Sequence, residues 1–366
     1  MGWKTKIMSD FYKLKVKDVR KETNDCTSVE LEVPRNLRRE FRYGAGQHII
    51  FKKEFDGEEI RRTYSLCTDP FSRKWRVCVK QIPDGKFSTY VNKELEIGDY
   101  VDASSPTGKF GTDVKLEPDK RRNFLFIAAG SGITPIISMV KMVLEQEPMA
   151  HCQLLYCNQK VQTIVFREEL EQLRNRFMER FELYHILSNQ KRDVELFSGL
   201  LKREKMEKLT QSLIDLENLD HCFMCGPEDM TFELRDALVD LGLEKRKIHY
   251  ELFVTGLSEE DKKRAAAAME KRYEGTKVTV IEGGTESSFV MSDAYDNVLD
   301  AALGNGADVP FACKDGMCST CKCKVEEGSV EMKKNYALEK DDLDKGYVLS
   351  CQSVPTSEKL KVNYDV

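Results

Sequence analysis

Five of the twelve cysteines lie in the last quarter of this 366-residue chain, and four of those five fall within eleven residues. Cys313, Cys318 and Cys321 have the spacing C-x4-C-x2-C, and Cys351 follows thirty positions after Cys321. In a long chain without a recognisable export signal, grouped thiols indicate metal ligation or redox chemistry rather than a disulfide framework. The C-terminal part of the chain is therefore expected to fold around a thiolate site.

Two kinds of metal centre suit four thiolates. The spacing is that of a plant-type 2Fe-2S centre, in which one close-fitting loop supplies three thiolates and a distant strand supplies the fourth. Gly316, Ser319 and Thr320 are small enough to let the loop backbone approach two irons. A structural zinc site is the alternative, but zinc ribbons usually present two C-x2-C knuckles, whereas the fourth cysteine here stands alone. Cys323 is left as a spare thiol. The predicted metal ligands are Cys313, Cys318, Cys321 and Cys351.

The charge balance argues against a nucleic-acid partner, because the net charge of the chain is only -5. Residues 273–366 carry 17 acidic and 10 basic residues, a local balance of -7 that leaves +2 for the rest of the chain. An acidic C-terminal module fits a docking surface that is steered by charge, and it fits equally a surface that is merely solvated.

No membrane span and no secretory signal is recognisable in the sequence. The longest uncharged stretch, 123–140, approaches the length of a span, but Gly130, Gly132 and Pro135 interrupt it. We expect a strand, a loop and a helix there instead. The N-terminus lacks both an apolar core and a small-residue cleavage site. We therefore expect a cytoplasmic protein.

The rhythm of apolar residues divides the chain into three modules and a linker. Residues 10–115 alternate short β-rich runs with turn clusters, which predicts a small antiparallel β-barrel or sandwich. Residues 116–256 alternate apolar runs with amphipathic stretches, which predicts a parallel α/β sheet. The alanine-rich segment 257–272 is expected to form a helical linker capped by Ser258. Residues 273–366 begin with a predicted hairpin across Gly283 and Gly284, followed by a short helix over 296–303.

The sequence R-T-Y-S at residues 62–65 ends a β-rich segment and suits a flavin dinucleotide. Such a cofactor needs a cation for its pyrophosphate, a flat aromatic surface for its isoalloxazine and a hydrogen-bonding group near its redox-active nitrogen. Arg62, Tyr64 and Ser65 supply these groups in turn. The sequence G-K-F-S at residues 85–88 opens a predicted helix whose free N–H groups suit a phosphate. Taken singly, these motifs fit an ordinary core tyrosine and an ordinary turn equally well.

Two further motifs follow predicted strands of the α/β module. The loop G-S-G-I-T-P at residues 130–135 has glycines that permit a close approach to a pyrophosphate and a proline suited to a first helical turn. It departs from the G-x-G-x-x-G fingerprint, because Pro135 occupies the last glycine position. The C-G-P turn at residues 225–227 ends another strand, where an open α/β sheet places its ligands. Cys222 and Cys225 also form a C-x2-C pair, but a dithiol or zinc knuckle is disfavoured because Cys222 falls within the strand.

Taken in order, these motifs and the E-L-F sequence at residues 251–253 resemble the ferredoxin–NADP reductase superfamily across residues 10–255. Residues 273–366 resemble a plant-type ferredoxin domain over their whole length. The fusion is similar to the reductase components of multicomponent oxygenases, most of all to those that serve phenylacetyl-CoA epoxidases. The resemblance implies an FAD-binding antiparallel β-barrel, an NAD(P)H-binding α/β domain and an α+β ferredoxin domain of the β-grasp type.

The resemblance also implies roles for individual residues. Those implied to bind FAD are Arg62, Tyr64, Ser65, Gly85, Phe87 and Ser88. Those implied to bind the nicotinamide dinucleotide are Gly130, Ser131, Gly132, Thr134, Cys225, Gly226 and Pro227. The implied catalytic residues are Ser65, Cys225 beside the nicotinamide and Glu251 near the flavin edge. A solvated surface position is the alternative for Glu251.

Electron counting sets the order of the modules. A nicotinamide delivers two electrons together as hydride, a 2Fe-2S centre accepts one at a time, and a flavin can stand between them. The expected path runs from NAD(P)H to FAD, to the 2Fe-2S centre and on to an oxygenase component. The sequence S-N-Q-K-R at residues 188–192 favours NADPH through its cations. NADH is the alternative, because no arginine directly follows Ser188.

Three other functions remain open at this stage. The chain could serve a hydroxylase of other aromatics, alkanes or steroids, because no motif binds the final organic substrate. It could be a reductase that works alone and resembles the reductase part of flavohaemoglobins. It could also be a zinc-stabilised binding module without enzymatic activity. Iron, acid-labile sulfide and flavin in the purified protein would separate the last alternative from the others.

Overall fold

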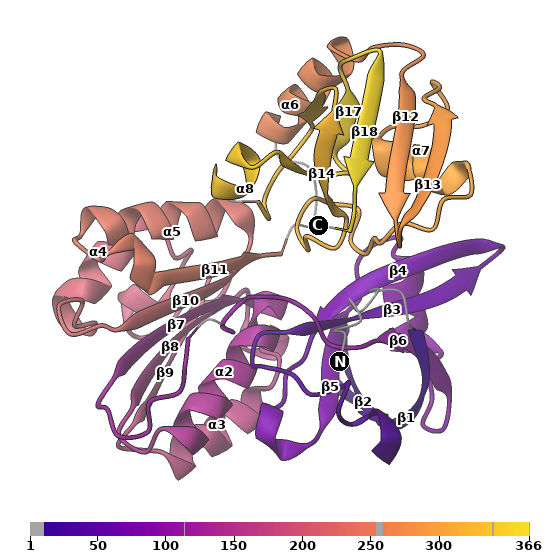
Figure 1. The fold of residues 1–366 in the computed structure, drawn as a ribbon. Helices are drawn as coiled ribbons and strands as arrows, with labels where there is room; N and C mark the ends of the chain where they lie inside the picture. Colours follow the sequence, from indigo (N-terminus) through magenta and orange to yellow (C-terminus); the bar gives the residue numbers. More distant parts are fainter. Residues whose placement is uncertain (1–10, 113, 254–258, 339, 366) are drawn as a thin grey trace. The chain divides into compact units, whose positions relative to one another are not determined.

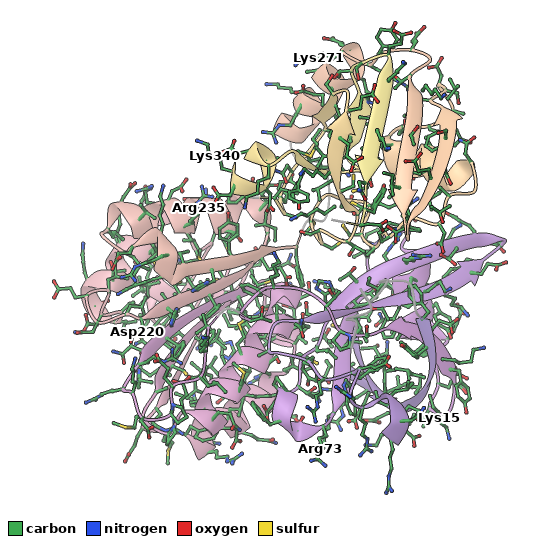
Figure 2. All side chains as sticks on the ribbon, viewed as in Figure 1. Lys15, Arg73, Asp220, Arg235, Lys271 and Lys340 are labelled. Carbon is green, nitrogen blue, oxygen red and sulfur yellow. The ribbon has the colours of Figure 1, made fainter. Side chains whose placement is uncertain are left out.

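The computed structural model describes residues 11–112, 114–253, 259–338 and 340–365. The chain divides into two compact units, one spanning Phe11–Val254 and the other containing Thr255–Val366. Figure 1 shows the first unit in indigo to pink and the second in orange to yellow. Figure 2 shows that charged side chains such as the exposed Lys15 and Arg73 point away from the ribbon of the first unit.

The first part of this unit is a six-stranded antiparallel sheet in the order β4-β3-β6-β1-β2-β5. Apolar and polar residues alternate along the strands, so that Leu14 and Val16 are fully buried while Lys15 is exposed. An antiparallel bridge between Leu66 and Val77 joins β4 to β5 and closes the sheet into a barrel. The elements are β1 (Phe11–Thr23), β2 (Cys26–Glu32), β3 (His48–Phe55), β4 (Glu58–Ser65), β5 (Trp75–Lys80), α1 (Lys86–Lys93) and β6 (Tyr100–Ser104).

The second part is a five-stranded parallel sheet in the order β11-β10-β7-β8-β9. Its central strand β7 reads N-F-L-F-I-A-A and is buried on both faces, as a sheet covered by helices requires. Helices α2 and α3 pack on one face, and α4 and α5 on the other (Figure 1). The elements are β7 (Asn123–Ala129), α2 (Ile133–Gln146), β8 (His151–Asn158), α3 (Arg167–Arg176), β9 (Phe181–Leu187), α4 (Arg203–Ser212), β10 (His221–Gly226), α5 (Glu228–Asp240) and β11 (Ile248–Leu252).

The second unit is built on a mixed sheet in the order β13-β12-β18-β14-β16, with a separate two-stranded pair β15-β17. Strand β12 pairs in parallel with β18 and antiparallel with β13. Helix α7 buries Val298, Leu299 and Ala302 against this sheet. The elements are α6 (Glu259–Glu270), β12 (Lys277–Glu282), β13 (Thr285–Val290), α7 (Val298–Gly304), β14 (Lys322–Glu327), β15 (Val330–Met332), α8 (Lys340–Asp344), β16 (Tyr347–Leu349), β17 (Ser353–Pro355) and β18 (Lys359–Asn363).

The three predicted fold classes are confirmed: an antiparallel barrel, a parallel α/β sheet and a mixed α+β sheet. The predicted linker contains helix α6, and Lys271 just beyond that helix pairs with Glu331 of β15, 3.3 Å between Nζ and Oε2. The predicted cap Ser258 lies outside the described residues. In the described part of the chain, no helix has the length and apolarity that a membrane crossing requires.

Candidate active site and cysteine loop

The parallel sheet reverses its strand order between β7 and β10, and the predicted nucleotide motifs lie at this point. The chain leaves β7 through Gly130 and leaves the neighbouring β10 through Pro227. Open α/β sheets bind ligands in the crevice at the carboxyl ends of such a pair of strands. A Cβ atom on Gly132 would lie 2.3 Å from the carbonyl oxygen of Cys225, so only glycine fits between the two loops.

The G-S-G-I-T-P loop presents helix N–H groups at this crevice. Gly130 has a φ of +52°, and no side chain caps the first turn of α2. Thr134 donates its hydroxyl to the Ser131 carbonyl at 3.0 Å, which holds the turn together. Tyr156 of β8, which is fully buried, donates to the Gly130 carbonyl at 3.0 Å. The first turn of this 14-residue helix has no side-chain cap, and such a helix start suits a pyrophosphate.

The structure brings Ser65, Cys225 and Glu251 together from three strands. Cys225 of β10 and Glu251 of β11 are register partners, and Ser65 at the end of β4 hydrogen-bonds to Glu251. Burial raises the pKa of Glu251 to about 8, and the hydrogen bond from Ser65 opposes this shift only in part. Among the described residues, Oε2 of Glu251 is buried and has no hydrogen-bond partner. The structure therefore contradicts the solvated alternative for Glu251.

Cys225 is fully buried, and burial raises the pKa of its thiol, with the charge of Glu251 adding to the shift. Cys222 points to the other face of β10, where it packs in the core beneath α4 and α5. The two cysteines thus belong to different cores, and they do not form a dithiol or a zinc knuckle.

The R-T-Y-S motif forms the last half of β4. The Tyr64 ring stacks on Phe87 with ring centroids 5.8 Å apart, and Phe87 stacks in turn on Phe51 at 5.7 Å. Phe87 is 3% exposed, so it supports the tyrosine from inside the barrel. The Arg62 side chain is exposed, and its guanidinium donates to the Arg61 carbonyl at 2.7 Å. Tyr64 thus offers a supported flat surface beside an exposed cation.

The G-K-F-S segment forms the start of α1. The Ser88 hydroxyl donates to the Gly85 carbonyl at 3.1 Å and accepts from the Ile82 N–H at 3.3 Å. A Cβ atom on Gly85 would lie 2.4 Å from the Ser88 hydroxyl oxygen. The Ser88 hydroxyl therefore stabilises the turn before α1. Because no side chain caps this helix, the backbone N–H groups of its first turn can bind a phosphate.

These observations test whether the residues fit a flavin and a nicotinamide dinucleotide. Among the described residues, the buried Oε2 of Glu251 has no hydrogen-bond partner, and no side chain caps the first turn of α1 or α2. At position 132, next to Cys225, there is no room for a side chain larger than that of glycine. Buried polar atoms without partners are rare in folded proteins and usually await a ligand or water. The residues at this site fit both groups.

The second candidate site is the cysteine loop, where strand pairing brings distant ligands together. Lys322 of β14 pairs with Leu349 of β16, so Cys321 before β14 meets Cys351 after β16. The Ser350 N–H donates to the Cys321 carbonyl at 3.1 Å. The thiols of Cys321 and Cys351 are hydrogen-bonded to each other, and so are those of Cys313 and Cys318. The four predicted ligands therefore form two pairs.

The backbone of this loop curls around the thiols. Lys314, Gly316 and Ser319 all have positive φ angles, between +55° and +74°. The Asp315 N–H points at the Cys313 sulfur at 3.3 Å. Gln352 donates from Nε2 both to the Lys314 carbonyl at 2.7 Å and to the Cys351 sulfur at 3.5 Å.

The arrangement of the thiols bears on the kind of metal centre. Two pairs of thiols fit two irons, each held from one side. Cys323 is fully buried in the core of this unit, away from that role.

Residues 13–111 match the model of an oxidoreductase FAD-binding domain, residues 126–236 that of an oxidoreductase NAD-binding domain, and residues 280–356 that of a 2Fe-2S iron-sulfur cluster binding domain. The chain is 38% identical over 358 residues to one of the subunits of the 1,2-phenylacetyl-CoA epoxidase of Escherichia coli, covering 98% of this chain and 99% of that protein. The chain belongs to the family of oxygenase reductases.

Other members and solved structures share the same modules. The reductase is 31% identical over 361 residues to the ferredoxin reductase component of 3-ketosteroid-9-alpha-monooxygenase of Mycobacterium tuberculosis, covering 96% and 95% of the two chains. Phthalate dioxygenase reductase has a similar fold, with a TM-score of 0.61 at 21% identity over 96% and 98% of the chains. The reductase is thus a flavin and iron–sulfur oxidoreductase that transfers electrons from NAD(P)H through FAD to a 2Fe-2S centre.

Two residues at these sites were missed in the sequence. Tyr156 lies within a strand that was predicted only as an apolar run, and a tyrosine in such a run signals a hydroxyl in need of a partner. Gln352 directly follows the fourth cysteine and is 4% exposed. The position of this amide next to the predicted ligand Cys351 could have indicated a hydrogen bond to the sulfur. Its contact with the Lys314 carbonyl depends on the fold and could not be predicted from the sequence.

Proposed function

We propose that this reductase draws electrons from NADPH and delivers them to the oxygenase component of a phenylacetyl-CoA epoxidase. The convergence of Ser65, Cys225 and Glu251 at the point where the sheet reverses its order carries the redox part of the proposal. The 38% identity over nearly the full length of the Escherichia coli epoxidase protein supports the choice of partner.

The chain's own residues bind and orient the two dinucleotides. Arg62 provides a cation for the FAD pyrophosphate, Tyr64 a surface for the isoalloxazine, and the start of α1 at Gly85 N–H groups for a phosphate. The loop from Gly130 to Thr134 binds the phosphates of the nicotinamide dinucleotide at the start of α2. Gly226 and Pro227 direct the chain away from the crevice, so that Cys225 lines the nicotinamide position.

Glu251 holds a proton next to the redox centre, and Ser65 orients the carboxyl group that carries it. With a pKa near 8, Glu251 is mostly protonated at neutral pH and can donate from its carboxyl group. Ser65 hydrogen-bonds to this carboxyl and holds its orientation. When bound, the flavin and the 2Fe-2S centre supply the change from a two-electron donor to one-electron delivery. Cys313, Cys318, Cys321 and Cys351 would hold the 2Fe-2S centre as thiolates.

The preference for NADPH is supported by positive charge beyond the end of β9. His185 lies within β9, two residues before its end, and its pKa is lowered to about 4 by burial and by Arg192, Arg167 and Arg174. Cations gathered around this position suit the 2'-phosphate that distinguishes NADPH from NADH. Initial rates of ferricyanide reduction with the two coenzymes test this preference, and a higher kcat/KM with NADH would contradict it.

The choice of partner is tested by reconstitution. The purified reductase is combined with the oxygenase component of the Escherichia coli epoxidase, and NADPH-dependent oxidation of phenylacetyl-CoA is measured. A parallel reaction uses the oxygenase component of the mycobacterial 3-ketosteroid monooxygenase, because the 31% identity to its reductase makes a steroid system the second candidate. We expect product with the epoxidase and background with the steroid enzyme, and the reverse result would contradict the proposal.

A further inference from the structure

Helix α2 connects the two halves of the first unit through hydrogen bonds to the chain just beyond Ser65. Ser138 donates its hydroxyl to the Thr68 carbonyl at 2.6 Å, and Lys141 donates Nζ to the Cys67 carbonyl at 3.0 Å. The same helix begins directly after Gly132, which lies against Cys225. One rigid helix, about 12 Å long from Ile133 to Lys141, therefore spans from the Cys225 side to the strand that carries Ser65.

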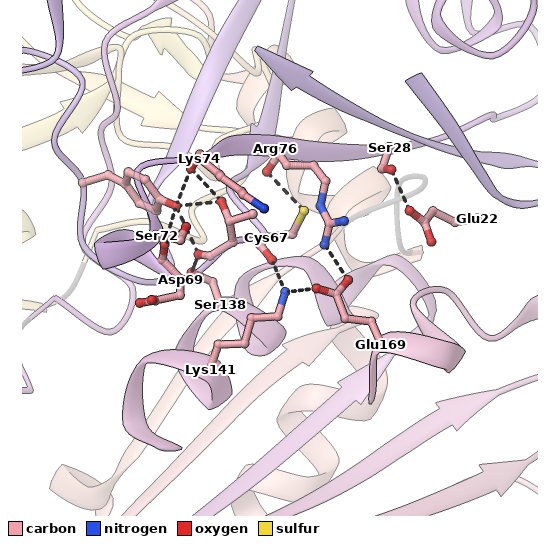
Figure 3. Close-up of polar contacts among 12 residues, drawn as sticks. Glu22, Ser28, Cys67, Asp69, Ser72, Lys74, Arg76, Ser138, Lys141 and Glu169 are labelled. Atoms are coloured by element: carbon pink, nitrogen blue, oxygen red, sulfur yellow. Dashed lines mark hydrogen bonds and ion pairs between the residues drawn. The ribbon is translucent and has the colours of Figure 1, made fainter. Parts of the chain in front are cut away.

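Lys141 belongs to a three-membered charge cluster, defined here as Arg76, Lys141 and Glu169 (Figure 3). Nζ of Lys141 lies 2.6 Å from Oε1 of Glu169, and Nη2 of Arg76 lies 2.5 Å from Oε2 of the same carboxylate. Arg76 comes from β5 of the barrel, Lys141 from α2 and Glu169 from α3. The carboxylate thus joins a cation of the barrel to a cation of the parallel sheet.

The barrel side of this cluster is tied to the same segment. The Cys67 N–H donates to the Arg76 carbonyl at 2.8 Å, and the Cys67 thiol donates to that carbonyl at 3.1 Å. Tyr43 adds a hydrogen bond to the Thr68 hydroxyl at 2.7 Å. Residues 67 and 68 are therefore held from both sides, and Ser65 lies two residues before them.

The cluster is costly to bury, and each of its charges has a counter-charge, although among the described residues Nε of Arg76 is buried without a hydrogen-bond partner. Lys141 is 8% exposed, and a buried ammonium without a counter-charge would be strongly unfavourable. Burial raises the pKa of Glu169, but Lys141 and Arg76 outweigh it and hold that pKa below its ordinary value. Apolar side chains often stabilise such an interface as well as an ion cluster does, so the cluster's specific geometry needs a separate explanation.

We propose that the Arg76–Lys141–Glu169 cluster is a positioning device that fixes Ser65 of the barrel relative to Cys225 and Glu251 of the parallel sheet. Hydride transfer needs its donor and acceptor at near-contact distance, and a misplacement of about 1 Å can cost on the order of 100-fold in rate. The cluster acts through the Cys67 carbonyl, which accepts from Lys141, and Ser138 of the same helix holds the neighbouring Thr68 carbonyl. This inference rests on the proposed function, because it assumes that hydride crosses between these two parts.

The test replaces Glu169 with Gln, which keeps the shape of the side chain and removes the central charge. We expect the rate of flavin reduction by saturating NADPH, measured by anaerobic stopped flow, to fall roughly 10-fold. The Kd for NADPH and the flavin content stay unchanged, and the isotope effect with 4-deuterated NADPH rises. On the resting protein, hydrogen–deuterium exchange at residues 66–72 increases, which is a readout independent of turnover.

The chain offers a matched control and a rescue. Glu145 of α2 and Arg176 at the end of α3 form an exposed ion pair between the same two helices, 2.5 Å from Oε1 to Nη1, without touching the barrel strand. Glu145→Gln is expected to leave the reduction rate and the exchange unchanged. Lys141→Arg keeps a cation at this position and is expected to restore most of the rate that Lys141→Met loses.

The outcomes are separable. If Glu169→Gln fails to fold, the double variant Lys141→Met/Glu169→Gln keeps the net charge of the cluster and serves in its place. Wild-type reduction rates and exchange in these variants would overturn the inference, as would an equal loss of rate in Glu145→Gln. A wild-type flavin that NADPH leaves oxidised would instead overturn the proposed function, and the exchange data would still test the cluster's role in holding residues 66–72.

Discussion

The nicotinamide crevice and the cysteine loop handle the same electrons but are assembled in opposite ways. Cys225 and Glu251 come from neighbouring strands of the parallel sheet, and Ser65 comes from the barrel far earlier in the sequence, so pairing of β10 with β11 and packing of the two sheets bring them together. The cysteine loop takes three of its four ligands from nine consecutive residues, and local backbone geometry shapes it. The first site therefore depends on how whole domains pack, whereas the second depends on a short stretch of chain.

The two sites also differ in how their polar groups are satisfied. At the crevice, the carboxyl of Glu251 is buried with one oxygen unpartnered, so its protonation state responds to pH and to ligand. In the cysteine loop, the carbonyl of Lys314 and the N–H of Asp315 have partners within the loop or from Gln352. We expect the crevice to be sensitive to pH and the loop to be sensitive to loss of a ligand.

The largest expected effect separates the two sites completely. Substitution of Cys318 by Ser removes one of the paired thiols, so the 2Fe-2S centre is lost and reduction of a protein acceptor falls to background. Reduction of ferricyanide by NADPH should largely persist, because the crevice lies in the other unit. Visible spectra, iron content and both activities measure the outcome.

The control for that experiment is Cys323→Ala. Cys323 packs in the core of the same unit and is no ligand of the predicted set, so the variant should retain its iron and its activity with the protein acceptor. Equal loss of both activities in Cys318→Ser would contradict the assigned order of electron transfer.

The next effect tests the buried carboxyl through the stability of the flavin-free protein. Folding raises the pKa of Glu251 from 4.5 to about 8, so the folded state holds a proton that the unfolded state releases in that interval. The stabilisation is complete below pH 4.5 and is lost as pH rises through 8, by at most about 1.4 kcal/mol per pH unit. The Tm of Glu251→Gln should therefore rise relative to that of wild type between pH 5 and pH 8, which thermal unfolding measures.

A matched control for the carboxyl is Glu244→Gln. Glu244 lies shortly before β11, and its pKa is lowered below 4.5 by a hydrogen bond from Arg246. Its contribution to stability is lost only as pH falls through this lower pKa, so its Tm difference from wild type should stay flat above pH 5. A flat difference for Glu251→Gln as well would show that Glu251 is not buried as a neutral acid.

The smallest expected effect concerns the cysteine loop. Gln352→Met removes a donor to the Cys351 sulfur, and such donors stabilise the reduced, more negative centre. Loss of a hydrogen bond that stabilises the reduced centre by about 1 kcal/mol lowers its one-electron reduction potential by about 40 mV. Redox titration measures the shift. Asn363→Ala, which removes an exposed amide bonded to Glu326, should leave the potential unchanged, and an unchanged potential in Gln352→Met would sink this role for the glutamine.

Much of the fold followed from periodicity. The strand, loop and helix predicted over residues 123–140 form as β7, the turn at Gly130 and α2. The hairpin across Gly283 and Gly284 also forms as expected, because both glycines take the positive φ that its tight turn needs. Helix α4 was missed, since its sequence R-E-K-M-E-K-L-T-Q-S buries only Met206 and Leu209. So short an apolar stripe becomes visible only when the sheet face that it covers is known.

The cysteine loop could be predicted from the sequence, whereas the assembly of the nicotinamide crevice could not. Cys313, Cys318 and Cys321 follow from their spacing, since a contiguous loop carries its geometry in its sequence. The roles of Ser65, Cys225 and Glu251 came from a resemblance, and the structure adds that they meet. Arg76, Lys141 and Glu169 could not be foreseen as a cluster. Lys141 directly follows the uncharged stretch 123–140, so a charged side chain at this place in an apolar helix can be seen in the sequence. Its partners come from other strands and helices, and the sequence does not show how these pack.

The burial of the remaining thiols has a consequence for how the metal is loaded. Seven of the eight cysteines outside the predicted ligand set are buried. Burial also raises the pKa of Cys67 to about 11 and that of the eighth, Cys157, to about 12. Protonated, enclosed thiols compete poorly for iron, because only the thiolate is a good ligand. Cys321 and Cys351 are buried as well, so the ligand set is distinguished by the gathering of four thiols at one place, and iron and sulfide delivered to the folded apoprotein meet one group of four among the twelve cysteines.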